Sequence, residues 1–159
     1  NVTLNAAWLA QNSTDTGSYQ GYQFIGTITS TGSSLISSGT SKGNHLNGLA
    51  STTFDVQSGT LNMDSTAPLL DGSPAQSGAG VLVKTGAGTL LLQAASTYTG
   101  GSTINAGTVT ANNLQALGTG PVTVSGSTAR LQTVSSLNGK LTLGGKLTMA
   151  SNAILRIGG

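Results

Sequence analysis

Lys84-Thr-Gly-Ala-Gly-Thr-Leu-Leu-Leu-Gln93 is followed, after a short link, by Thr97-Tyr-Thr-Gly-Gly-Ser-Thr-Ile-Asn-Ala-Gly-Thr-Val109. In both stretches a Gly-Thr pair leads into aliphatic or β-branched residues, which favour strands. Glycine lets the backbone turn sharply because it carries no Cβ. The two stretches therefore predict consecutive strands joined by glycine turns.

Three strings within this region carry a resemblance to a known repeat: K-T-G-A-G-T-L, T-Y-T-G-G and I-N-A-G-T-V. Together they resemble the autotransporter-associated β-helix repeat, or passenger-associated transport repeat, of bacterial proteins that secrete themselves across the outer membrane. The resemblance covers about residues 80–124. It implies a parallel β-helix in the barrel-proximal part of a passenger, where folding outside the cell supports secretion. It implies no particular activity.

The composition is consistent with a folded, secreted chain of this kind. The 159 residues suffice for one domain with a sizeable core, and charged residues make up only 6%. A net charge of +2 gives no electrostatic footprint for nucleic acid. The chain has no cysteine, and no apolar run of about 18 residues suggests a membrane helix. Its first residues do not resemble a signal peptide, so we expect a mature or excised piece of a longer protein.

Apolar residues recur in pairs two positions apart, which places both members of a pair on one face of a strand. We expect these pairs to face the core: Phe54/Val56, Leu61/Met63, Val81/Val83, Leu90/Leu92, Val122/Val124, Leu141/Leu143, Leu147/Met149 and Leu155/Ile157. Charged residues have the opposite parity and are expected outside: Asp55, Asp64, Lys84, Arg130, Lys140, Lys146 and Arg156.

The spacing of the Gly-Thr pairs predicts the length of one coil. The interval from Gly88 to Gly107 is close to one coil of a parallel solenoid, whereas the longer interval from Gly59 to Gly88 requires an extra loop. With about 20 to 25 residues per coil, the chain makes roughly seven coils. The polar segment 31–47 separates strands expected around 24–28 and 54–63.

We therefore predict an all-β, right-handed parallel β-helix (β-solenoid), with an antiparallel β-sandwich as the alternative. The expected organisation is one solenoid segment over residues 1–159. Residues 1–79 would form divergent coils, residues 80–124 the recognisable repeat and residues 125–159 further coils.

Catalytic residues are not expected. His45 is the one histidine, no Gly-x-Ser-x-Gly elbow occurs, and Gly39-Thr-Ser41 lies just upstream, so a solvated loop histidine is the better interpretation. Asp15-Thr-Gly17 matches the triplet of aspartic proteases, but that chemistry needs two carboxylates, so a plain turn is favoured.

Cofactor and metal sites are not expected either. Residues 139–146 resemble a phosphate-binding loop only superficially, because Leu147 stands where Ser or Thr is required, and they are better interpreted as two strands and a turn. The chain has no glutamate, and Asp15, Asp55, Asp64 and Asp71 are too scattered in sequence for a metal cage. The two N-glycosylation patterns, at Asn1 and Asn12, are treated as chance matches.

One cluster of aromatic residues remains as a candidate binding surface. Tyr19-Gln-Gly-Tyr-Gln-Phe24, with Trp8 nearby in sequence, holds four of the six aromatic residues. Such residues form sugar- or protein-binding patches, but Tyr22 and Phe24 two positions apart more simply fill the interior or cap an end. No binding residue is assigned.

These observations, with the resemblance, indicate a non-catalytic structural rod in an autotransporter passenger, extracellular or at the surface of a Gram-negative bacterium. The alternatives are an adhesin for a host or cell-cell ligand and a filament subunit that stacks end to end. The expected partners are adjoining coils of the parent passenger or other copies of the chain, and a host or cell-surface ligand. Nucleic acid and membrane insertion by this segment are not expected.

Overall fold

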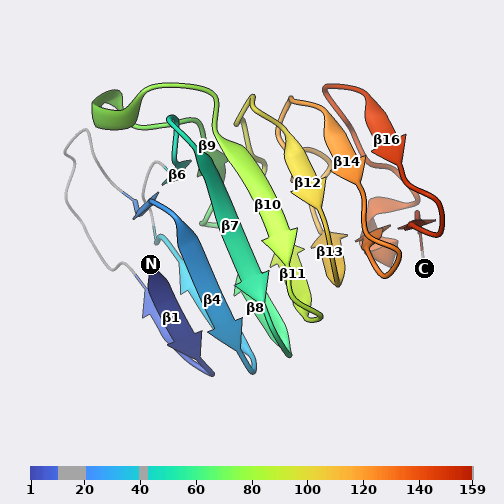
Figure 1. Cartoon of the computed structure of the whole chain (residues 1–159), viewed down its shortest axis with the longest axis horizontal. Coiled ribbons are helices and arrows are strands. Elements are labelled where there is room, and N and C mark those ends of the chain that lie inside the picture. The colour runs from blue at the N-terminus through green and yellow to red at the C-terminus, as the bar shows by residue number, and fades with distance from the viewer. Residues whose placement is uncertain (11–20, 40–42, 159) are drawn as a thin grey trace.

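The computed structural model describes residues 1–10, 21–39 and 43–158. Its strands form two seven-stranded sheets and one three-stranded sheet, and every strand pair is parallel. Strands that are neighbours in a sheet come from successive turns of the chain, so the sheets are the sides of a solenoid (Figure 1). The predicted parallel β-solenoid is confirmed, and the antiparallel sandwich is excluded.

Sheet A contains β1 (Val2–Asn5), β4 (Thr27–Thr31), β7 (Ser51–Val56), β10 (Val81–Thr85), β12 (Ser102–Ile104), β14 (Val122–Val124) and β16 (Leu147–Met149). Sheet B contains β2 (Trp8–Ala10), β5 (Ser34–Ser37), β8 (Thr60–Met63), β11 (Thr89–Leu92), β13 (Thr108–Ala111), β15 (Arg130–Thr133) and β17 (Ile154–Arg156). Sheet C contains β3 (Gln23–Phe24), β6 (Asn44–Leu46) and β9 (Leu69–Leu70). Two short 3-10 helices lie at Pro74–Gln76 and Ser135–Leu137.

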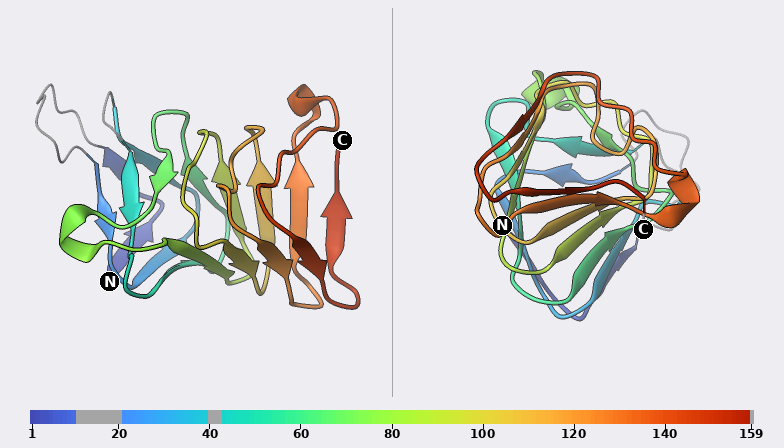
Figure 2. Two further views of the ribbon diagram at one scale, coloured as in Figure 1. Left: turned by 90° about the horizontal axis from the view of Figure 1, so that it is seen from above. Right: turned by 90° about the vertical axis from the view of Figure 1, so that its right-hand side faces the viewer.

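Each coil passes from sheet A through a turn to sheet B and then returns along the third side. Seven strands in each of sheets A and B confirm the seven coils expected from the spacing. In the first three coils the return segment from sheet B to sheet A includes a strand of sheet C. The later return segments, at residues 93–101, 112–121 and 134–146, contain no strand. The view along the rod in Figure 2 shows the coils stacked on one another around a common interior.

The core runs through the inside of the stack because parallel in-register pairing places like positions above one another. Leu61, Leu90, Val109 and Leu131 are successive register partners in sheet B, and all four are fully buried. The step along the chain from Leu61 to Leu90 is longer than the step from Leu90 to Val109, as the glycine spacing predicted. The extra residues of the longer coil include β9 and the 3-10 helix Pro74–Gln76.

Gly107 shows why glycine occupies the turns between sheets A and B. Its φ of 65° is a left-handed conformation that residues with a Cβ adopt at a cost. A Cβ built there would lie 2.4 Å from the Gly86 carbonyl oxygen and 2.5 Å from that of Gly88. The turn of one coil therefore rests directly on the turn of the coil before it.

The predicted inward phase is confirmed for several strands. Phe54/Val56, Leu61/Met63, Leu90/Leu92 and Val122/Val124 are all buried, whereas Asp55 and Arg130 lie partly exposed at the intervening or adjacent positions.

The predicted phase is wrong for β10, where Leu82 and Lys84 face inward and Val81 and Val83 face outward. Lys84 is fully buried and pairs in register with the buried Phe54 and Ile104. The chain tolerates an inward lysine because Nζ reaches the end of the strand and donates to three backbone oxygens, those of Thr85 at 2.5 Å, Gly86 at 2.8 Å and Ala106 at 3.2 Å.

Two further details of the sequence prediction are corrected. The polar segment 31–47 is not a spacer, because it contains β5 and β6, whose inward positions are filled by Ser34, Ile36, Asn44 and Leu46. Leu141 and Leu143 are not in a strand: the residues after the 3-10 helix Ser135–Leu137 run irregularly, and both leucines pack from the side against the core. Residues 139–146 therefore do not form two strands and a turn.

Candidate functional site

An exposed row of outward side chains lies on sheet B, on the side of the rod. Trp8 on β2 pairs in register with Leu35 on β5, Leu35 with Asn62 on β8, and Asn62 with Leu91 on β11. The neighbouring Leu9, Ile36, Met63 and Leu92 belong to the inward row. Alternation along the strands therefore sends Trp8 and Leu35 outward, and Trp8 is 70% exposed.

A shallow concavity of about 460 Å³ lies over these four strands. Its apolar lining includes Trp8, Leu35 and Leu91, and its polar lining includes Ser33, Thr60 and Asn62. Within the part of the chain that the structure describes, no residue that lines it carries a charge. We call this surface the Trp8 face.

Hydrogen bonds between coils organise the polar part of the Trp8 face. Gln93 donates Nε2 to Asn62 Oδ1 at 2.7 Å, and Asn112 donates Nδ2 to Gln93 Oε1 at 3.3 Å. These amides lie on β8 and just beyond β11 and β13, so they form a ladder across three coils. The ladder fixes the Asn62 side chain, and within the described residues no hydrogen bond uses its Nδ2 donor.

The corner between β10 and β11 holds the most perturbed ionisable group among the cations. Burial lowers the pKa of Lys84 to about 8, and the negative charge of Asp55 opposes this shift. Asp55 in turn accepts a hydrogen bond from the Thr85 hydroxyl at 2.9 Å. Because Nζ is bound by backbone oxygens within the rod, this lysine is a structural group.

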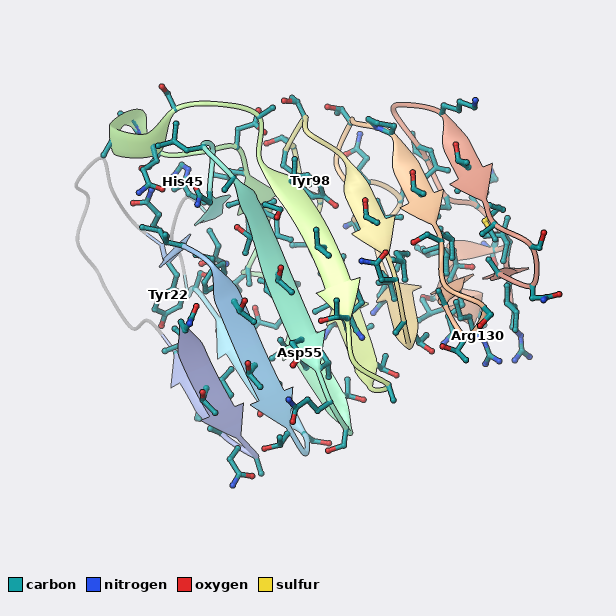
Figure 3. All side chains as sticks on the ribbon, in the orientation of Figure 1. Tyr22, His45, Asp55, Tyr98 and Arg130 are labelled. Carbon is teal, nitrogen blue, oxygen red and sulfur yellow. The ribbon has the colours of Figure 1, made fainter. Side chains whose placement is uncertain are left out.

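His45 lies on the strand β6 rather than in a loop, which corrects the predicted location. Its Nδ1 is 2.7 Å from the Asp71 carbonyl oxygen, a contact that ties adjacent coils together. The Asp71 carboxylate accepts hydrogen bonds from the backbone of Gly80 and Thr99. Figure 3 shows that His45, on β6, lies well away from Asp55, which is near the C-terminal end of β7. The Ser41 candidate and the Asp15-Thr-Gly17 triplet lie outside the described residues.

The aromatic cluster seen in the sequence is divided by the fold. Phe24 is buried, with its ring 5.9 Å from that of Tyr22 and 5.8 Å from that of Phe54, so the expected interior role of Phe24 is confirmed. Trp8 instead lies outside, on sheet B. Tyr19 is outside the described residues.

The described part of the chain offers neither a metal cage nor a membrane helix. No group of three or more His, Cys, Asp or Glu side chains there is arranged to hold a metal ion. Within the same residues, no helix has the length and apolarity needed to cross a bilayer.

The Trp8 face is a candidate binding surface that the sequence did not identify. The tryptophan was visible, but its neighbours Leu35, Asn62 and Leu91 are far from it along the chain. The signal available in advance was the odd position of Leu91 in Thr89-Leu-Leu-Leu92, since a third leucine between two inward ones must point outward.

Comparison with known proteins identifies the repeat. The family model described as the passenger-associated-transport-repeat matches residues 82–111, which run from β10 to β13. The Adhesin BmaC autotransporter of Brucella suis biovar 1 (strain 1330) is 34% identical over 105 residues, which are 60% of this chain and 3% of that protein. No solved structure matches the chain.

The match spans two strands of sheet A and two of sheet B, so the repeat is a structural unit of about one and a half coils. Its residues supply the inward leucines, the buried lysine and the stacked turn glycines described above. This chain, which spans only 3% of the length of its adhesin relative, carries at residues 82–111 the passenger-associated transport repeat of autotransporter passengers.

Proposed function

We propose that this chain is a non-catalytic structural segment of a secreted passenger, displayed outside a Gram-negative bacterium, and that its folding supports secretion. The single observation that carries the proposal is the continuous inward stack of Leu61, Leu90, Val109 and Leu131. Each coil that folds outside the cell buries another apolar layer on the one before it, at about 25 cal/mol per Å² of apolar surface. Sliding backward would expose that layer.

The test uses the chain placed between a secretion signal and a membrane barrel, with surface display measured by protease accessibility. Leu131→Asp places a carboxylate inside the stack, where its burial costs several kcal/mol, and we expect display to fall severalfold. Gln132→Asp is the matched control, because Gln132 is the next residue of β15 and is only partly buried. Equal display of the two variants would refute the proposed role.

The proposed absence of catalysis is tested separately. The purified chain is expected to show no peptidase or esterase turnover. The support is that, among the described residues, the hydrogen-bond partner of the His45 ring is the Asp71 carbonyl oxygen and not a nucleophile. A turnover that His45→Ala abolishes would overturn this part of the proposal.

We further propose that other parallel coils, from the parent passenger or from another copy, pack end to end beyond β17. Leu155 is 42% exposed although its register partner Leu131 is fully buried, so the inward apolar row extends to an uncovered layer. Light scattering should show association that rises with concentration and is lost in Leu155→Pro, which removes a backbone donor from the strand. A wild-type chain that stays monomeric at high concentration would argue against pairing between copies.

A second candidate function, adhesion, is favoured by a specific observation. The Trp8 face exposes an indole and two leucine side chains on the lateral surface, where another coil stacked at either end would leave them accessible. The relative from Brucella suis is itself named an adhesin. Adhesion would require no change in the rod, since Trp8, Leu35, Asn62 and Leu91 all occupy outward positions of their strands.

A further inference from the structure

We infer that the Trp8 face is a binding site for a neutral glycan. The inference rests on the adhesion alternative given above and names its ligand class. Three features of the face carry it: an exposed indole, the alternation of apolar and amide or hydroxyl groups beside it, and the absence of charge among the lining residues.

The exposed indole suits a sugar ring. A pyranose presents a flat face of C–H groups that packs on an aromatic ring, while its hydroxyl groups project around the edge. Trp8 offers such a ring, 70% exposed, and the adjacent Leu35 extends the apolar platform. Tryptophan contributes large contact area at little entropic cost, since few side-chain torsions are ordered on binding.

The polar groups at the edge suit sugar hydroxyls, which both donate and accept hydrogen bonds. Ser33 and Thr60 supply hydroxyl groups, and Asn62 supplies an amide that Gln93 holds in place. Because Gln93 already holds the Asn62 amide, ordering that side chain adds little to the cost of binding. Apolar floor and fixed polar groups together are the usual make-up of a small-ligand site.

The lining excludes the main alternative ligands on chemical grounds. Among the described residues that line the face, all are neutral, so an anionic or cationic ligand would meet no opposite charge from them. A peptide that adds a strand would pair with the backbone at the free edge of β2, whereas the Trp8 face consists of outward side chains on the face of sheet B, where β5, β8 and β11 are paired on both sides. A neutral ligand that binds through side chains is what remains.

The row also has the length of an oligosaccharide rather than of one sugar. Trp8, Leu35, Asn62 and Leu91 follow one another across four strands, spaced about 4.8 Å apart. Each step is comparable with the length of one pyranose ring. A linear chain of a few sugars laid along the rod axis would contact the whole row.

The test exploits the fact that Trp8 is the one tryptophan of the chain, so its fluorescence reports on this face alone. Neutral hexasaccharides, namely cellohexaose, chitohexaose, xylohexaose and mannohexaose, are titrated into the full chain. We expect at least one to shift or quench the emission saturably, with affinity in the micromolar to millimolar range. Hexagalacturonate, an anionic probe, should bind less well.

Variants of residues on and off the Trp8 face locate the binding site. Calorimetry with the active glycan should show a loss of about tenfold or more for Trp8→Ala and a partial loss for Asn62→Leu. Leu49→Ala is the matched control, because Leu49 is an equally exposed apolar residue, 74% accessible, that does not line the concavity. Circular dichroism checks that every variant keeps the fold.

Several outcomes would overturn the inference. These are no response to any neutral hexasaccharide, binding that Trp8→Ala retains, or tighter binding of the anionic probe. An emission change caused by raising the protein concentration alone, or by phosphatidylcholine vesicles, would assign the face to a second copy or a lipid surface instead. None of these results affects the display experiment with Leu131→Asp, so the structural role is tested independently of the glycan site.

Discussion

Lys84→Ala tests how much the buried Lys84 side chain contributes to stability, at a position that the sequence pattern predicted to be outside the rod. The substitution removes a donor that binds the carbonyl oxygens of Thr85, Gly86 and Ala106. It also removes part of a fully buried side-chain stem. Three hydrogen bonds from a charged group contribute about 1.5–3 kcal/mol each, and the lost methylenes about 0.8 kcal/mol each.

Relief of the ammonium desolvation, which lowers the pKa of Lys84 and costs several kcal/mol in the folded chain, offsets most of this loss. We expect the free energy of unfolding to fall by about 3 kcal/mol, or the melting temperature to fall by about 6–12 °C for a chain of this size. The assay is thermal and urea unfolding followed by far-UV circular dichroism at pH 7.

Two controls separate the contributions. Lys146→Ala, at an exposed lysine, should change stability by no more than about 0.5 kcal/mol. Lys84→Met keeps most of the aliphatic stem and removes the donors. The decrease in the free energy of unfolding in this variant therefore measures the hydrogen bonds to the carbonyl oxygens of the turns. If Lys84→Ala proves as mild as Lys146→Ala, the inward phase of β10 and the reasoning about its corner are both wrong.

Two further predictions follow from the same turns and core. Folding lowers the pKa of Lys84 from 10.5 to about 8, so between these pH values the unfolded chain binds more protons than the folded chain. The melting temperature should therefore rise from pH 8 to pH 10 in the wild type and not in Lys84→Met. Above about pH 10 the melting temperature should fall, because burial raises the pKa of Tyr98 in the folded chain. In urea unfolding, Gly107→Ala should lower the free energy of unfolding clearly more than Gly139→Ala. Both glycines have a positive φ, but only at Gly107 would the added Cβ meet backbone oxygens. Equal losses in the two variants would contradict the stacking of the turns.

The local sequence predicted short strands joined by glycine turns, and the resemblance of residues 80–124 to a known repeat favoured the solenoid over the antiparallel sandwich. Alternation at Leu61/Met63 and Leu90/Leu92 places apolar side chains on one strand face, and the unequal steps between successive Gly-Thr pairs matched the observed coils. These features are encoded within a few residues, because strand alternation and glycine turns depend on local backbone geometry. The repeat at residues 82–111 was recognisable for the same reason.

The phase of β10 depended on tertiary structure. Val81-Leu-Val-Lys-Thr85 contains apolar residues at both parities, so alternation alone does not choose a face. Pairing with β7 and β12 chooses it, because Lys84 then reaches carbonyl oxygens that two successive turns supply. The polar strand β5 was missed for a related reason: Ser34 is satisfied by the backbone N–H of Ala7, which belongs to the preceding coil.

The Trp8 face likewise exists only in the folded rod. What the sequence by itself determined was the repetition of short strands, which follows from side-chain alternation and glycine, and the resemblance of its repeat implied the solenoid. What the tertiary structure decided was the register between coils of unequal length, which brings Trp8, Leu35, Asn62 and Leu91 into one row. The physical reason is that coil length varies with the loops, while hydrogen bonding between parallel strands aligns residues regardless of their distance in the chain.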